Sequence, residues 1–439
     1  MNRRFFSSFR SLLLALIAAI IVTIAACGDD ETEGTPTGGS PAQGVKFDGT
    51  LKIGFLEDLS GPGGATATTL SHEVAGKSAM EDINAKGGVM VGGKRYKLEQ
   101  KVIDTRADPT ATVAGANQLL SEQNLVAVYI GSLHADQAYQ QLKTRVLSYA
   151  ASPAVTYHID SPVPIPGEGA QNNPLLFSNI DGFTPIVAAH LKMATLAFPE
   201  IKTTAMLASD APLGRNLTRA TEVTSQQLGL QFVGAEFAPL GTQDLTIQAT
   251  NLKTKGPDFI FYATQPSILD GLNAALEVGA GKYHGVWTLR PVEIKNQLRS
   301  LGRSALVSPD WRLPFHKNLV PPEYRSAVDK LGELPGGEPR HTGWAISQWD
   351  FIHLLAQAIE KADTVSDARA IAQALIGQTY DGPFGKTTVL ENQTSRGTIG
   401  QITKQGDTYT VWGWESIDAV LQGKPPIIKF SAPASQVEP

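Results

Sequence analysis

Short apolar runs alternate with longer amphipathic stretches along most of this 439-residue chain. The first short run covers 51–56, and the amphipathic stretch that follows it covers 69–86 and ends at Gly87 and Gly88. Apolar residues recur about every 3.6 positions in the longer stretch, which predicts a helix, and the short runs predict buried strands. Alternating strands and helices are typical of parallel βαβ units, so the chain is expected to be an α/β protein.

The alternation restarts near residue 177 without a long linker before it, which predicts two lobes in close contact. Helices are expected at 69–86, 109–120, 135–146, 185–196, 213–228, 245–252, 268–278 and 341–362. Strands are expected at 51–56, 96–104, 126–130, 147–151, 177–180, 204–208, 230–237, 259–262 and 285–289, with a hairpin over 400–414.

The first 26 residues have the composition of an export signal. Three arginines precede an apolar run over 12–24, which as a helix is about 20 Å long and too short for a hydrocarbon core of about 30 Å. A basic start, a short apolar run and small residues at its end predict a secretory signal rather than a membrane span. Residues 2–6 also resemble a twin-arginine signal, so the Sec and twin-arginine routes both stay open.

Cys27, the single cysteine of the chain, directly follows this signal. Residues 24–27 resemble a bacterial lipobox, which implies that Cys27 is acylated and anchors the protein to a membrane; an ordinary signal cut near a cysteine is the alternative. Residues 28–44 contain no large apolar side chain, so 27–48 is expected to be a flexible tether. With Cys27 used for the lipid, the body has no thiol for a disulfide or a thiolate zinc site.

The charge balance and the missing motifs exclude several classes of protein. The chain has 37 basic and 42 acidic residues and a formal net charge of −5, which argues against a nucleic-acid partner. We find no Gly-x-Ser-x-Gly elbow, P-loop, dinucleotide fingerprint or paired-histidine metal motif. The chain is therefore not expected to be an enzyme or to hold a metal ion or a cofactor. It is expected to be a monomer.

Six short motifs in order carry a family resemblance. They are Leu59-Ser60-Gly61-Pro62, the segment 81–88, Asp104 with Ala107-Asp108-Pro109, the segment 128–131, the segment 151–154, and Gly382-Pro383-Phe384-Gly385. With these motifs behind a lipoprotein-type signal, the chain resembles the type I periplasmic solute-binding proteins of branched-chain amino acid ABC importers, over about 51–414.

The resemblance implies two doubly wound parallel-sheet lobes joined by three crossing segments. Lobe I would comprise 49–180 plus 308–396, and lobe II 181–307 plus 397–430. The implied function is capture of a small solute outside the cytoplasm and its delivery to an ABC permease and ATPase, with the lobes closing around the ligand. The same fold in a sensory receptor without transport is the alternative. The implied location is the cell envelope, in the periplasm or on the outer face of the cytoplasmic membrane.

The resemblance also places a ligand site at the strand ends of both lobes. The loops there are rich in Gly, Ser and Thr, and such loops offer backbone N–H groups and hydroxyls that suit a carboxylate, although caps and tight turns alone would have the same composition. Carried over by position, the implied ligand contacts are Ser132, His134, Ala135, Val155, Thr156, Asp181, Leu213, Gln265 and Arg290.

Several of these positions depart from the family pattern. His134 and Ala135 stand where hydroxyls are expected, and Leu213 and Gln265 where aromatic residues are usual. Arg290 falls where amino-acid binders carry the glutamate that pairs with the ligand ammonium. A guanidinium there would repel an ammonium and attract a carboxylate. The ligand is therefore expected to be a small carboxylate-bearing molecule, either like a branched-chain amino acid or an organic or aromatic acid.

Overall fold

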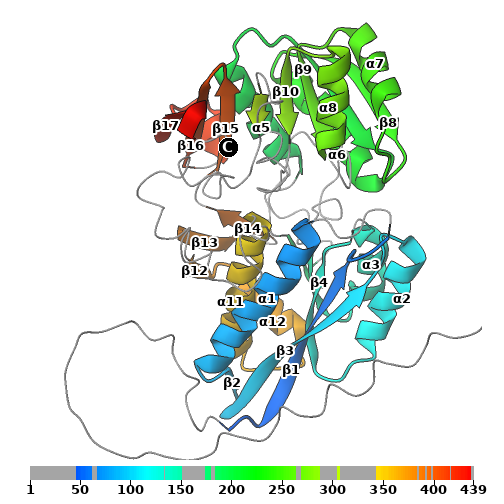
Figure 1. The fold of residues 1–439 in the computed structure, drawn as a ribbon. Coiled ribbons are helices and arrows are strands. Elements are labelled where there is room, and N and C mark those ends of the chain that lie inside the picture. The colour runs from blue at the N-terminus through cyan, green and yellow to red at the C-terminus, as the bar shows by residue number, and fades with distance from the viewer. Residues whose placement is uncertain are drawn as a thin grey trace, which may run out of the picture. The chain divides into compact units, whose positions relative to one another are not determined.

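The computed structural model describes twelve segments of the chain, which begin after the predicted signal and most of the tether. They are residues 46–61, 67–132, 134–150, 174–178, 183–263, 268–286, 304–306, 343–382, 385–390, 393–396, 399–415 and 417–436. Within these segments the strands form two sheets, here called sheet A and sheet B (Figure 1).

Sheet A has nine described strands in the order β12-β13-β14-β6-β5-β4-β1-β3-β2. They are β1 (Gly49–Glu57), β2 (Val89–Val91), β3 (Lys94–Asp104), β4 (Leu125–Ile130), β5 (Leu147–Ala150), β6 (Leu176–Ser178), β12 (Thr379–Gly382), β13 (Gly385–Leu390) and β14 (Gln393–Arg396). The central strands β3, β1, β4, β5 and β6 pair in parallel, and antiparallel pairs lie at both edges.

Sheet B has eight described strands in the order β17-β16-β15-β11-β10-β9-β7-β8. They are β7 (Thr203–Ser209), β8 (Gln231–Ala238), β9 (Phe259–Ala263), β10 (Tyr283–Val286), β11 (Ser304–Leu306), β15 (Ile399–Gln405), β16 (Thr408–Trp414) and β17 (Ile428–Pro433). From β8 to β11 the strands are parallel, and the hairpin of β15 and β16 continues the sheet in the antiparallel sense.

Helices cover both faces of each sheet. The described helices are α1 (Ala67–Ala85), α2 (Pro109–Leu120), α3 (Ala135–Leu142), α5 (Phe183–Ala197), α6 (Pro212–Gln227), α7 (Thr246–Lys255), α8 (Ile268–Val278), α11 (Gly343–Ala362), α12 (Ala368–Leu375), α13 (Ile417–Leu421) and the short 3₁₀ helix η6 (Ala434–Gln436). One face of sheet A packs against α1, α11 and α12, and the other against α2 and α3 (Figure 1). In the same way α7 and α8 cover one face of sheet B, and α5 and α6 the other.

The alternation of buried side chains explains this double covering. Along β9, Ile260 and Tyr262 pack under α7 and α8, whereas Phe259 and Phe261 pack under α5 and α6. Successive side chains of a strand point to opposite faces, so a continuous apolar run needs a layer of helices on each side. The predicted α/β class with doubly wound parallel sheets is confirmed.

The order of the strands shows how the chain connects the two sheets. It builds the parallel part of sheet A first, then the parallel part of sheet B, returns to sheet A for β12–β14 and ends in sheet B. The three passages fall within 179–182, 307–342 and 397–398, which are outside the described residues.

Several predicted boundaries were wrong by one to four residues, and two of them have a clear physical reason. The helix predicted over 135–146 ends at Leu142, because Lys143, Thr144 and Arg145 are exposed and form turns instead of a further helical turn. The strand predicted to begin at 285 begins at Tyr283, since Tyr283 and His284 are buried and pair with the first residues of β9.

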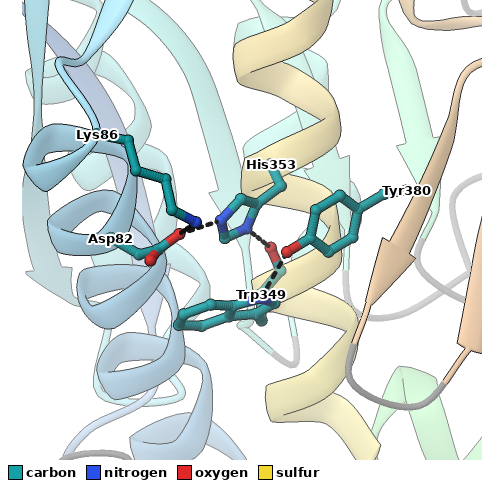
Figure 2. A network of polar contacts seen from close by, with 5 residues as sticks. All are labelled: Asp82, Lys86, Trp349, His353 and Tyr380. Atoms are coloured by element: carbon teal, nitrogen blue, oxygen red, sulfur yellow. Dashed lines mark hydrogen bonds and ion pairs between the residues drawn. The ribbon is translucent and has the colours of Figure 1, made fainter. Parts of the chain in front are cut away.

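A polar contact joins α1 to α11 within their apolar interface (Figure 2). Asp82 on α1 accepts hydrogen bonds from Lys86 at 2.6 Å and from Nε2 of His353 on α11 at 3.0 Å. The His353 ring stacks on Tyr380 of β12 with centroids 4.6 Å apart, and the Trp349 indole N–H donates to the Tyr380 hydroxyl at 3.1 Å. This network ties the edge strand β12 to both helices.

Candidate functional site

The loops after β1, β3 and β4 meet at the carboxyl edge of sheet A. In open parallel sheets, ligands bind outside the carboxyl ends of the strands, where loops and helix N-termini converge. Here the loop after β3 leads into α2 and the loop after β4 leads into α3. This edge, built from 57–61, 104–109, 130–132 and 134–135, is the candidate site.

Two acidic residues tie the loops after β1 and β3 to each other. Asp58, just after β1, accepts from the hydroxyl of Thr105 and from the backbone N–H of Ala107 at 2.9 Å. Asp104, at the end of β3, accepts from the backbone N–H groups of Leu59 at 3.1 Å and Ser60 at 3.2 Å. Each carboxylate therefore holds the loop that follows the other strand.

Further hydrogen bonds hold the Asp104 carboxylate ionised. It also accepts from the Ser60 hydroxyl at 2.5 Å and from the backbone N–H of Arg106 at 2.9 Å. Partial burial alone would raise the pKa of Asp104, but these donors favour the charged form more strongly and hold its pKa below the usual range.

The backbone of these loops adopts conformations that depend on this pairing. Arg106 and Ala107 have φ angles of 56° and 52°, a left-handed conformation that non-glycine residues rarely adopt. Gly61 has a φ of 85°, and a Cβ atom there would lie 2.2 Å from the carbonyl oxygen of Arg106. The two loops are thus in direct backbone contact, and glycine at 61 is required for it.

Ser132 connects the loop after β4 to the Asp58 carboxylate, which also holds the loop after β3. It is 1 % exposed, and its hydroxyl donates to Oδ1 of Asp58 at 3.0 Å. Its oxygen in turn accepts the backbone N–H of His134 at 3.1 Å, one residue before α3 begins. The predicted ligand contact Ser132 thus gives its hydroxyl hydrogen to Asp58.

The His134 ring is oriented by the loop after β3. Its Nε2 lies 3.1 Å from the carbonyl oxygen of Ala107, and because a carbonyl can only accept, Nε2 is the nitrogen that carries the hydrogen. Its Nδ1 is buried and has no hydrogen-bond partner among the described residues. Ala135, the first residue of α3, is 3 % exposed and belongs to the core between α3 and sheet A.

Glu57, the last residue of β1, is a buried acidic residue that was not predicted from the sequence. It is fully buried, and a Cβ atom at Gly131 would lie 2.0 Å from its Oε2. Glycine at 131 therefore leaves the space that the Glu57 carboxylate occupies. The signal in the sequence was an acidic pair, Glu57 and Asp58, directly after an apolar run.

A buried pair lies near the carboxyl end of β9 in sheet B. The Tyr262 hydroxyl is 2.7 Å from Nδ1 of His284. Burial lowers the pKa of His284 to about 4 and raises the pKa of Tyr262 well above its usual value, so both groups are neutral near pH 7. Either group can be the donor of this hydrogen bond, according to which nitrogen of the neutral imidazole carries the hydrogen.

Most other predicted contacts lie outside the described residues. These are Val155, Thr156, Asp181, Gln265 and Arg290, together with the predicted acylation site Cys27. Leu213 is the second residue of α6, and its side chain is not among those described. The structure therefore brings together only Ser132, His134 and Ala135 from the predicted set.

Neither a metal cluster nor a membrane-spanning helix is found among the described residues. No group of three or more His, Cys, Asp and Glu side chains has a geometry that could hold a metal ion there. No helix in the described part of the chain is long and apolar enough to cross a membrane.

Comparison with known proteins agrees with this architecture. The sequence profile of a family described as "Periplasmic binding protein" matches residues 50–405. The Leu/Ile/Val-binding protein homolog 7 of Brucella abortus is 23% identical over 391 residues, which cover 82% of this chain and 91% of the relative. Because the profile spans most of the chain, the protein belongs to the periplasmic binding protein family, whose type I members bind solutes for ABC importers.

Solved structures share the fold at low sequence identity. A leucine binding protein from Thermotoga maritima has a TM-score of 0.64 at 16% identity and covers 82% of this chain and 97% of its own. A solute binding protein of an ABC transporter from R. palustris, solved in complex with benzoate, has a TM-score of 0.65 at 12% identity. The match covers 86% of this chain and 97% of that protein. At these identities the similarity concerns the fold alone.

Proposed function

We propose that this protein is a lipid-anchored solute-binding protein that captures a small carboxylate-bearing ligand outside the cytoplasm and delivers it to an ABC importer. The observation that carries the proposal is the strand-end site of sheet A within a chain that matches the family over 50–405. There the loops after β1, β3 and β4 are cross-linked through Asp58 and Asp104, so the edge is preorganised for binding.

Arg290 supports the assignment of the ligand class. It replaces the glutamate that would pair with an α-ammonium, so the proposed ligand needs a carboxylate but no free α-amino group. Thr156 would donate a second hydrogen bond to that carboxylate. Val155, Asp181, Leu213 and Gln265 remain proposed contacts by position. A branched-chain amino acid is the competing ligand, and the names of the Brucella and Thermotoga relatives favour it.

The anchoring and the partners are also proposed. Acylated Cys27 and the tether over 27–48 would hold lobe I (49–180 plus 308–396) and lobe II (181–307 plus 397–430) near the membrane. A permease and an ATPase would receive the ligand, and the protein itself would act as a monomer without enzymatic activity. Closure of the lobes would follow from contacts made only in the ligand-bound state.

A thermal-shift screen across several classes of compound tests the proposed ligand class. The mature protein is heated with single amino acids, aromatic acids, aliphatic acids, dicarboxylates and amides, since a ligand that binds only the folded state raises the unfolding midpoint. An organic or aromatic acid should raise it more than leucine, isoleucine or valine. If one of these three amino acids gives the largest shift, the proposed class is wrong, and the protein is a branched-chain amino acid binder.

A further inference from the structure

The Asp58 carboxylate lies inside the protein among three loops. It is 1 % exposed, and its Oδ1 accepts from the Thr105 hydroxyl, the Ala107 N–H at 2.9 Å and the Ser132 hydroxyl at 3.0 Å. Hydroxyls and backbone N–H groups at strand ends are the donors with which proteins bind a ligand carboxylate or another anion. Here the acceptor of these hydrogen bonds is the Asp58 carboxylate of the protein itself.

We propose that Asp58 is a built-in carboxylate that fills an anion subsite at the carboxyl edge of sheet A and closes it to a carboxylate of the ligand. Asp58 is then a specificity-determining residue. Ser132 is a positioning residue, because its hydrogen serves Asp58 and its oxygen holds the N–H of His134 at 3.1 Å.

The consequence for the ligand rests on the proposed function. If the hydroxyl and N–H donors of this edge already serve Asp58, the ligand carboxylate must be bound by other groups, as proposed for Thr156 and Arg290. The buried Nδ1 of His134 has no partner in the part of the chain that the structure describes; in the neutral ring it is an acceptor, which suits a donor group of the ligand. The occupied donors and the acceptor on His134 both indicate that this edge does not bind the carboxylate of the ligand.

Asp104 provides a matched control within the same two loops. Its carboxylate accepts from Leu59, Ser60 and Arg106, which is a comparable set of backbone and hydroxyl donors. It differs in being partly exposed, so water can replace it when the side chain is shortened. The hydroxyls of Thr105 and Ser132 are buried, and removal of the Asp58 carboxylate takes away the acceptor to which they donate, which is costly in the interior.

Formate, the smallest carboxylate, is the probe for the test. Asp58→Ala removes the carboxylate and leaves the enclosed donors around a space of similar size. Formate should then raise the unfolding midpoint of Asp58→Ala in a saturable way, with about an elevenfold shift of the folding equilibrium at ten times its dissociation constant. The wild type and Asp104→Ala should show no such response beyond that to chloride at equal ionic strength.

Two further variants locate the effect. Asp58→Asn keeps an oxygen at the position of Oδ1 and fills the space, so it should not respond to formate. Ser132→Ala added to Asp58→Ala removes one of the three donors and should weaken the formate response. A role of Asp58 in simple loop packing would produce neither difference.

Each result decides the proposal. A saturable response of the wild type would overturn it, because the subsite would then be open, and so would a folded Asp58→Ala protein that ignores formate. If Asp58→Ala does not fold, it is refolded from urea in formate and in chloride: recovery in formate alone supports the proposal, and equal failure overturns it. The test involves no physiological ligand, so its failure is distinguishable from failure of the proposed function.

Discussion

Asp82 on α1 and His353 on α11 form a hydrogen-bonded pair in which the carboxylate Oδ2 lies 3.0 Å from Nε2 of the ring (Figure 2). The other ring nitrogen of His353 lies 2.9 Å from the carbonyl oxygen of Trp349. A carboxylate can only accept, so Nε2 is the nitrogen that carries the hydrogen of the bond to Asp82. Because the acceptor is a carboxylate, the pair is a charge-assisted contact between two of the helices that cover one face of sheet A.

Acid should weaken this contact through Asp82. Burial alone would raise its pKa, but the hydrogen bonds from Lys86 and His353 outweigh burial and lower the pKa below its usual value of 3.8. A group with a depressed folded-state pKa stabilises the protein above its unfolded pKa and loses that contribution as the pH falls through the folded value. Stability should thus fall below about pH 3.8, and Asp82→Asn should flatten that part of the curve.

Urea unfolding at a series of pH values measures this effect. Glu99→Gln is the control, since Glu99 pairs with Lys97 on the surface, where both side chains are nearly half exposed. The control should keep the acid limb of the wild type. An Asp82→Asn protein whose stability falls as steeply as that of the wild type would rule out a contribution of this pair.

Gly131 and Glu57 should be energetically coupled. A Cβ atom at 131 would lie 2.0 Å from Oε2 of Glu57, so Gly131→Ala forces a displacement of a buried carboxylate and should destabilise the protein by about 1–3 kcal/mol. In Glu57→Ala the obstructing carboxylate is absent, and Gly131→Ala should then cost much less. A double-mutant cycle by urea unfolding gives the coupling. Additive effects of the two substitutions would contradict the contact.

The parallel strands were predictable from the sequence, whereas the edge strands β2, β12 and β17 were not. Helices cover both sides of β9, and the run 259–262 is accordingly apolar at every position. A short, continuous apolar run of this kind was sufficient to predict a buried strand. The strands β2, β12 and β17 are short and alternate buried or half-buried residues with exposed ones, which single-sequence patterns do not separate from loops. The helix α12 was missed although Asp367 caps it, because it is only 8 residues long.

The candidate site was predictable in place but not in its internal bonding. The loop of Ser132 and His134 was placed at the strand ends by the alternation of strands and helices. The bond from Ser132 to Asp58 joins residues 74 positions apart and depends on the pairing of β1 with β4. Nothing in the local sequence shows whether a loop serine faces a ligand or a carboxylate of the neighbouring loop.

Cys27 is predicted to hold the protein at a membrane. Cys27→Ala removes the thiol that would carry the lipid, so the variant should be found unprocessed or in the soluble fraction. Membrane fractionation and the mass of the mature N-terminus measure this directly. Unchanged processing and unchanged membrane association of the variant would show that Cys27 is not acylated.

Thr156 is predicted to donate a hydrogen bond to the ligand carboxylate. Thr156→Val removes the hydroxyl with little change in shape, and loss of a hydrogen bond to a charged group should weaken binding by about 1.5–3 kcal/mol. Calorimetry with the best ligand of the screen measures the difference, and Ser132→Ala is the informative comparison, because its hydroxyl serves Asp58. Equal affinity of wild type and Thr156→Val would remove Thr156 from the site.

Calorimetric titration of the mature protein with organic acids, beside the same titration of Arg290→Glu, tests the central claim most directly. The proposed function predicts saturable binding of one acid per chain with a dissociation constant of order micromolar, or about −8 kcal/mol. It also predicts that Arg290→Glu abolishes this binding, because a carboxylate would then repel the ligand. Absence of binding by any acid, or an affinity that Arg290→Glu leaves unchanged, would contradict the claim.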